Sequence, residues 1–177
     1  MHLEWVCSFM NKCMDRRRTT TMKTTLKKLA AIVLVSATVL SLAACSKGGS
    51  AKKVSKEDFV AKIEKEGFKT MDAGANEENG TKENVVAFSE EGLMVSYTIY
   101  NSKDDAKKQF DEMKESAEAS KKSGEIEKLS TSSSKITASS AEQYLVVVYA
   151  DDMTVVAAGT PDTSSKVDSV LKAIGVL

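Results

Sequence analysis

Apolar and polar residues repeat with a helical period in three segments of the C-terminal two thirds of this 177-residue chain. In the first segment, Phe59 and Ile63 lie four positions apart, a spacing that places both side chains on one face of a helix. The same kind of spacing predicts a long helix over 102–122 and a last helix after Pro161. The first two segments begin with Ser-Lys-x-Asp, a helix-capping pattern, and end at a glycine.

The segments between these helices show the two-residue alternation of β-strands. The clearest strands are 144–150 and 153–159, and a pair of aspartates between them is expected to form a turn. Asn79-Gly80 has the composition of a hairpin turn. Further strands are predicted at 68–71, 84–88, 93–100, 125–129 and 135–138. The order of elements favours an α+β fold, in which a mainly antiparallel sheet carries about three helices packed on one face.

A separate pattern precedes this domain. Residues 29–44 carry no charged side chain, and Lys23, Lys27 and Lys28 lie shortly before them. A basic start, a short apolar run and small residues at its end are the features of a secretory signal peptide. The alternative is a membrane-spanning helix, but such a helix needs roughly 20 apolar residues, and the uncharged run has 16.

The run ends in Leu42-Ala43-Ala44-Cys45, which resembles the lipobox of bacterial lipoproteins. The resemblance implies that the Cys45 thiol receives a diacylglyceryl group through a thioether, and that a signal peptidase then cuts between Ala44 and Cys45. Two or more acyl chains hold a protein stably on a bilayer. We therefore expect a lipid anchor on the outer face of the cytoplasmic membrane, with the membrane as one partner. The rest of the sequence resembles small lipoproteins of unassigned function.

These patterns divide the chain into four parts. Residues 1–21 precede Met22, where such a signal peptide would normally begin, so we interpret them as an over-extended start. The alternative is a genuine cytoplasmic extension. Residues 22–44 form the predicted signal peptide, and residues 45–54 form the lipidated cysteine and a flexible tether. Residues 55–177 have the size of a single domain.

Removal of residues 1–44 changes the composition of the protein. The remaining 133 residues contain 18 lysines, no arginine and 23 acidic residues, which gives a net charge of −5. Nucleic-acid binding typically requires a basic face, so we expect no nucleic-acid partner. Cys45 is the only cysteine left, which excludes an intrachain disulfide. Because histidine, arginine and a free thiol are absent from this part, we expect neither an enzyme nor a bound metal or cofactor.

Ser132-x-x-Lys135 matches the Ser-x-x-Lys element of penicillin-binding enzymes, in which a lysine activates a serine nucleophile. Those enzymes also need Ser-Asp-Asn and Lys-Thr-Gly elements, and neither occurs in this sequence. Ser50-x-x-Lys53 gives the same match inside the predicted tether, so we interpret both as chance matches. Acidic clusters also occur, but lysines are interspersed among them and the sequence has no 12-residue calcium-binding loop.

The two clearest strands are apolar on both faces. If the aspartates form the turn between them, Val146 lies opposite Ala157, and we assign this face to the helices. The other face carries Leu145, Val147, Tyr149, Thr154, Val156 and Ala158. Because an uncovered apolar patch usually marks an interaction site, we predict a surface for a partner, a ligand or a second copy at four of them: Val147, Tyr149, Thr154 and Val156. The alternative is that another part of the chain, such as residues 73–83, covers this face.

The sequence as a whole predicts a lipid-anchored extracytoplasmic domain that acts as a non-catalytic binding or interaction module. The alternative is a ligand-binding accessory lipoprotein of a transporter or a sensor. A small hydrolase is disfavoured, because the usual catalytic groups are scarce after residue 44.

Overall fold

The structure, a computed structural model, describes residues 51–177 of the chain. Within this range the helices are α3 (Lys56–Lys65), α4 (Lys103–Lys122) and α5 (Ser164–Ala173). The strands in the same range are β1 (Lys69–Asp72), β2 (Thr81–Phe88), β3 (Met94–Tyr100), β4 (Lys128–Thr131), β5 (Lys135–Ser139), β6 (Tyr144–Ala150) and β7 (Met153–Gly159). Three predicted features lie outside the described residues: the over-extended start at 1–21, the signal peptide and the lipobox-like sequence around Cys45.

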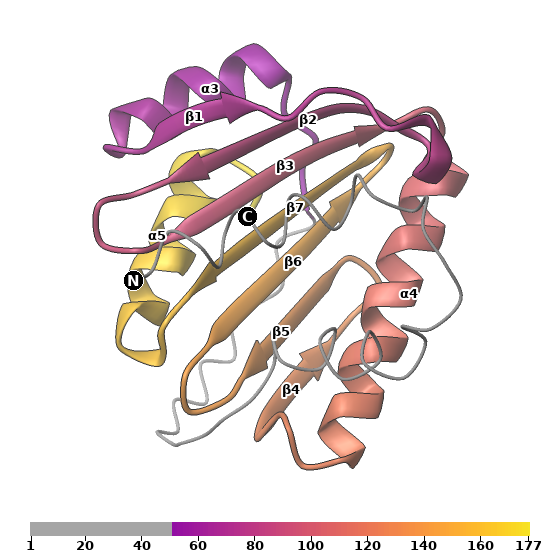
Figure 1. The fold of residues 1–177 in the computed structure, drawn as a ribbon, viewed down its shortest axis with the longest axis vertical. Coiled ribbons are helices and arrows are strands. Elements are labelled where there is room, and N and C mark those ends of the chain that lie inside the picture. The colour runs from indigo at the N-terminus through magenta and orange to yellow at the C-terminus, as the bar shows by residue number, and fades with distance from the viewer. Residues whose placement is uncertain (1–50) are drawn as a thin grey trace, which may run out of the picture. The chain divides into compact units, whose positions relative to one another are not determined.

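The seven strands form one antiparallel sheet in the order β1-β2-β3-β7-β6-β5-β4 (Figure 1). Strands β1 to β3 follow one another from one edge toward the middle, and strands β4 to β7 do the same from the other edge. The two series meet where β3 pairs with β7. This arrangement confirms the predicted α+β class and the antiparallel sheet. It also places β7 at the centre of the sheet, between β3 and β6.

The predicted ends of α3 and α4 are confirmed. The Ser55 hydroxyl accepts a hydrogen bond from the Asp58 backbone nitrogen, and the Ser102 hydroxyl accepts one from the Asp105 backbone nitrogen, each at 3.1 Å. Because the first N–H groups of a helix have no partner within it, such a cap stabilises the helix by about 1 kcal/mol. A glycine with positive φ follows shortly after each helix, as the sequence predicts.

The connection between β1 and β2 differs from the sequence prediction. Asn79-Gly80 does not form a two-residue hairpin turn, because residues 73–80 all lie between the two strands. The Asn76 side chain instead caps a short 3-10 turn, η2 (Glu77–Asn79). Gly80 follows with a φ of 71°, so the Asn-Gly pair ends this turn inside a longer loop.

Helices α3 and α5 cover one face of the sheet, which we call the closed face. Its strand side chains include Val85, Val95, Tyr97, Val146, Val155 and Ala157. Phe59 and Ile63 of α3 and Leu171 of α5 are each 0% exposed and pack against these side chains. The Tyr97 ring stacks on Phe59 with a centroid separation of 4.8 Å.

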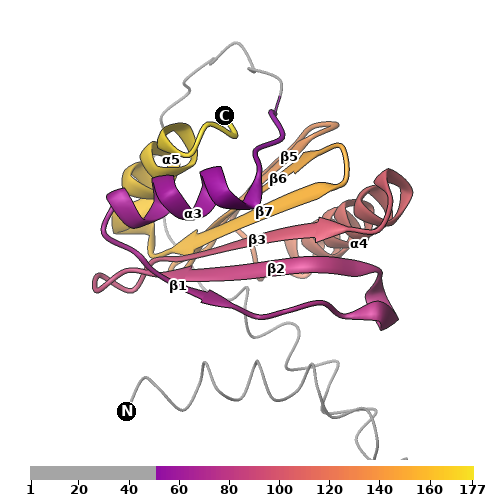
Figure 2. The same cartoon turned by 90° about the horizontal axis from the view of Figure 1, so that it is seen from above.

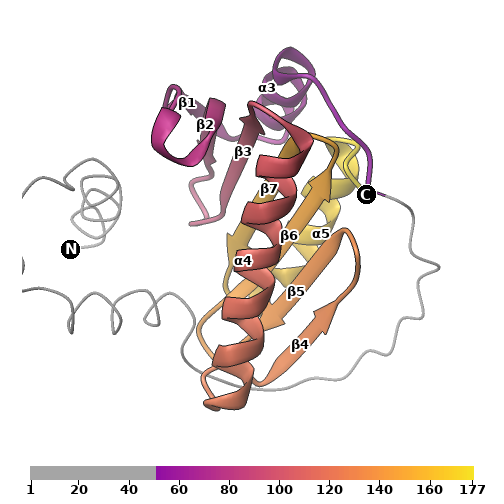
Figure 3. The same ribbon diagram turned by 90° about the vertical axis from the view of Figure 1, so that its right-hand side faces the viewer.

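Helix α4 lies on the opposite face of the sheet (Figure 3). Its Phe110 and Ala117 are buried in a second hydrophobic cluster with Ile136 and Val147. The prediction that the helices pack on one face is therefore wrong for α4. The physical reason is that β6 and β7 are apolar on both faces, so both faces require cover. The amphipathic pattern of a helix shows which of its own sides is buried, but it does not show which face of the sheet it meets.

Candidate interaction surface

The four residues predicted as an interaction site do share one face of the sheet. Val147 pairs with Val156, and Tyr149 pairs with Thr154, across β6 and β7. Their exposure differs, however. Val147 and Thr154 are each 1% exposed, whereas Tyr149 and Val156 are partly exposed. The predicted site is therefore not a uniformly accessible surface.

Helix α4 covers the part of this face that contains Val147 and Tyr149. The Phe110 ring of α4 stacks on the Tyr149 ring with centroids 5.4 Å apart, and Val147 lies in the same cluster. Thr154 is buried beside them, with its hydroxyl 3.2 Å from the Tyr100 hydroxyl. Burial raises the pKa of Tyr100. The chain thus covers these positions itself, as the sequence-based alternative stated, but with α4 rather than with the β1–β2 loop.

Val156 lies at the boundary of the area that α4 covers. It packs against the α4 cluster and also belongs to a row of side chains that continues across β3, β2 and β1. This row consists of Val156, Ser96, Val86 and Met71. A second row beside it consists of Ala158, Met94, Phe88 and Lys69. Every side chain in both rows is partly or fully exposed.

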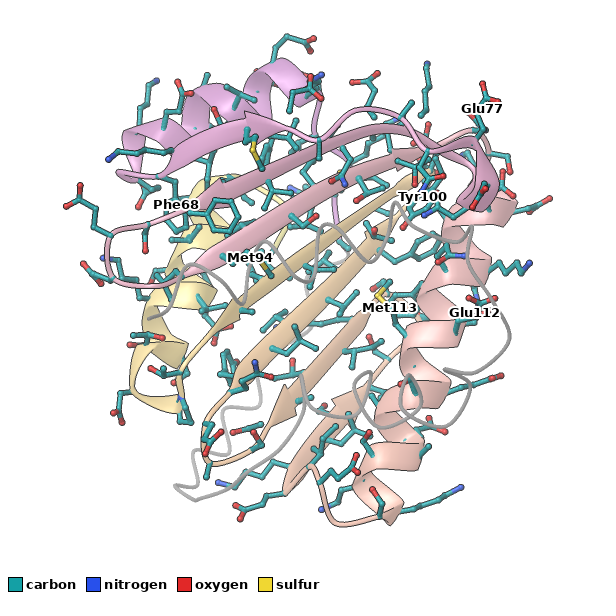
Figure 4. The ribbon with its side chains drawn as sticks, viewed as in Figure 1. Phe68, Glu77, Met94, Tyr100, Glu112 and Met113 are labelled. Atoms are coloured by element: carbon teal, nitrogen blue, oxygen red, sulfur yellow. The ribbon has the colours of Figure 1, made fainter. Side chains whose placement is uncertain are left out.

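The apolar members of the two rows form a surface that we call the open sheet face. It consists of Met71, Val86, Phe88, Met94, Val156 and Ala158. Met71 is 40% exposed, the most of any large hydrophobic side chain in residues 51–177. In Figure 4, Met94 lies on the part of the sheet away from α4, whereas Met113 lies beside the helix. A contiguous apolar surface of this kind is typical of the centre of a protein interface.

Charged side chains border the open sheet face at the β1 edge. Lys69 Nζ is 3.5 Å from Glu90 Oε1, and both side chains are exposed, so this ion pair contributes little to stability. Lys56 Nζ donates a hydrogen bond to Asp72 Oδ2 at 2.6 Å, and this bond lowers the pKa of Asp72. Charges on an edge strand discourage pairing with strands of other chains. The face is therefore better suited to binding than the edge beside it.

None of the residues predicted as an interaction site is Met71, Val86, Phe88 or Met94. The alternation along 84–88 and 93–100 does place such residues on one face of each strand. It gives no sign that α4 would leave that part of the face uncovered, because the position of a helix over a sheet depends on contacts distant in sequence.

The structure gives Ser132 a role in a turn between β4 and β5. Its hydroxyl oxygen accepts hydrogen bonds from the backbone nitrogens of Ser134 and Lys135, at 3.3 and 3.0 Å. Serine hydroxyls often satisfy backbone groups in turns in this way. The Ser132 hydroxyl therefore stabilises the turn between β4 and β5.

Residues 51–177 contain no group of three or more His, Cys, Asp or Glu side chains placed to hold a metal ion. None of the helices in that range is long and apolar enough to cross a membrane. The sequence matches no protein-family model, no curated protein and no solved structure. Two features remain for interpretation: the sequence pattern that ends at Cys45, which resembles a lipobox, and the open sheet face.

Proposed function

We propose that this chain is a lipid-anchored extracytoplasmic protein that binds another protein through its open sheet face. The anchor is inferred from the lipobox resemblance at Cys45. One observation supports the binding role: six neighbouring apolar side chains remain at least partly exposed at or beyond the boundary of the area that α4 covers. The proposed activity is binding without catalysis.

The energetic reason for binding is the burial of apolar surface. Each Å² of apolar surface removed from water contributes about 25 cal/mol. On the closed face, α3 and α5 already achieve this burial, and Val85 and Val95 are each 2% exposed there. On the open sheet face, Val86 and Met94 remain partly exposed. A partner that covers them would supply the contacts that α3 and α5 supply on the other side of the sheet.

The composition of the surface favours a protein as this partner. Its centre is apolar and includes Met71 and Met94, and methionine side chains adapt to different partner shapes. Ser96 lies within the centre, and Lys69 and Glu90 lie at the margin. Protein interfaces commonly combine an apolar centre with a polar rim in this way.

Site-specific cross-linking in cells tests the binding role. A photoreactive residue at Met94 should give one discrete adduct, because this position lies in the open sheet face. The same residue at Thr137 is the matched control, since Thr137 is also partly exposed but pairs with Val146 of the closed face. An adduct of twice the protein mass would identify a second copy as the partner. No adduct at Met94, or equal adducts at both positions, would contradict the proposal.

The variant Cys45→Ala tests the anchor. Without the thiol, no thioether to lipid forms, so the variant should accumulate as an uncleaved precursor. Mass spectrometry of the wild-type protein should show a modified Cys45 as the first residue. A free Cys45 in a chain that begins upstream of it would remove the basis of the proposal.

A further inference from the structure

The end of the tether is fixed to the folded domain. The Lys52 backbone nitrogen donates a hydrogen bond to the Val176 carbonyl at 3.2 Å. Two residues later, the Val54 carbonyl accepts a hydrogen bond from the buried Tyr97 hydroxyl at 3.0 Å. From Lys52 onward the chain is therefore part of the folded domain, and the proposed tether consists of the residues before Lys52.

This fixed point lies in the layer that α3 and α5 form over the closed face. Val176 follows shortly after α5, and Ala51 and Leu177 pack against the core cluster beneath the two helices. Figure 2 shows the C-terminus beside α3 and α5. The tether therefore leaves the domain on the closed side of the sheet, and the open sheet face points the other way.

The chain between the proposed lipid and the fixed point is short. Cys45 and Lys52 are seven peptide units apart. Fully extended, seven units span about 25 Å. A flexible chain of this length has an average end-to-end distance of about 15 Å.

The two sides of the domain require different tether lengths to approach a bilayer. With α3 and α5 toward the lipid, the fixed point lies within about one helix diameter of the surface, roughly 10 Å. With the open sheet face toward the lipid, α4 projects from the same face and meets the bilayer first. The layer of α3 and α5, the sheet and α4 would then place the fixed point about 25 Å from the surface. That distance is the full extended length of the tether, so this orientation would remove nearly all of its conformational freedom.

We propose that the anchored domain holds α3 and α5 toward the bilayer and directs the open sheet face away from it. The inference rests on the proposed lipid anchor at Cys45. It specifies the kind of partner, because a surface directed away from the bilayer is accessible to a protein outside the membrane. Lipid and the membrane-spanning part of another protein would face α3 and α5 instead.

Single-cysteine labelling measures this orientation on the full-length lipoprotein. Cys45 is the only cysteine of the mature chain and its thiol would carry the lipid, so one added cysteine can be labelled selectively. Ala173→Cys on α5 and Met71→Cys on the open sheet face both use exposed positions. Each labelled protein is bound to phosphatidylglycerol vesicles that carry a short-range nitroxide quencher on their headgroups. The fluorophore at position 173 should be quenched at least twofold more than the one at position 71. Equal quenching, or stronger quenching at position 71, would overturn the proposal.

A longer tether tests the cause of the orientation. Insertion of 20 Gly and Ser residues between Ser50 and Ala51 raises the average tether length to about 28 Å. Quenching at position 173 should then no longer exceed quenching at position 71 by twofold, and the two should approach equality. An unchanged difference would overturn the argument from tether length. Co-flotation with the vesicles reports on the anchor separately. Wild-type protein that stays in solution overturns the anchor and the orientation together, whereas flotation with equal quenching overturns the orientation alone.

Discussion

The two faces of the sheet differ in how completely helices cover them. On the closed face, α3 and α5 leave the inward side chains of β3, β6 and β7 at 8% exposure or less, except for Tyr144 at the start of β6, which is partly exposed. On the opposite face, α4 leaves Val147 1% exposed, while Val156 and Val86 stay partly exposed. These three valines lie in one row across the sheet. The same residue type in the same row therefore has two environments, buried beneath α4 and partly exposed beside it.

This difference predicts which substitutions should lower the stability of the fold and which should weaken binding to a partner. Side chains beneath a helix make contacts that a substitution destroys, so their replacement lowers the free energy of unfolding. Side chains of the open sheet face make fewer contacts within the chain, so their replacement should affect a partner more than the fold. Substitutions that add the same charge at matched positions can test this distinction directly.

The largest effect is expected beneath α5 on the closed face. Leu171 is 0% exposed, and Leu171→Asp places a carboxylate there without a partner, at a cost of several kcal/mol. Since domains of this size are stable by only about 5–15 kcal/mol, the variant should be largely unfolded at 25 °C by circular dichroism. Leu171→Met conserves the volume and should cost less than about 1.5 kcal/mol. A native-like thermal melt of the Asp variant would refute the packing of α5.

The next largest effect is expected beneath α4. Val147→Lys buries an ammonium group between the sheet and α4, and urea unfolding should show a loss of several kcal/mol. This outcome would also exclude Val147 as part of an accessible interaction site. A variant with wild-type stability would mean that α4 does not cover the position in solution, and the distinction between the two halves of this face would fail.

The sequence predicted those features that depend on neighbours in the chain. Ser55 and Ser102 cap helices because the capping contact spans only three residues. The pairing of Val148 with Val155 follows from the turn between β6 and β7, which fixes the register of both strands.

The side on which α4 packs was not predictable in the same way. Its apolar residues Phe110 and Ala117 indicate a buried stripe, but the stripe does not indicate which face of the sheet it meets. For this reason the sequence did not show that α4 covers part of the predicted interaction surface, since Val147 and Tyr149 share a face with Val86 and Met94 but lie under the helix. Their accessibility depends on a contact between elements far apart in the sequence.

An intermediate effect is expected at Tyr97, whose hydroxyl connects the closed face to the Val54 backbone just before α3. Tyr97→Phe removes the hydrogen bond to the Val54 carbonyl and should cost about 1 kcal/mol at pH 7 in urea unfolding.

The same variant should also change how the free energy of unfolding depends on pH at alkaline pH. Burial raises the pKa of Tyr97 in the folded state, so its contribution is complete below the ordinary tyrosine pKa of about 10 and is lost as the pH rises above that value. The wild type should therefore lose stability above pH 10 more steeply than Tyr97→Phe. Tyr100 and Tyr144 also have raised pKa values, so the variant should retain part of the alkaline loss. If the free energy of unfolding fell equally steeply with pH in the two proteins, this would contradict burial of the Tyr97 hydroxyl.

The smallest effect on stability is expected at Val86, the counterpart of Val147 in the uncovered half of the row. Val86→Lys places its ammonium group where the long aliphatic stem can carry it to water, so the loss should stay below about 1 kcal/mol. Because the added charge lies in the open sheet face, it should also abolish the cross-link formed from Met94, while Thr137→Lys on the closed side leaves that cross-link intact. If Val86→Lys instead lost as much stability as Val147→Lys, the open sheet face would be part of the core and the proposed binding role would fail. A small loss with an undiminished cross-link would place the partner elsewhere on the domain.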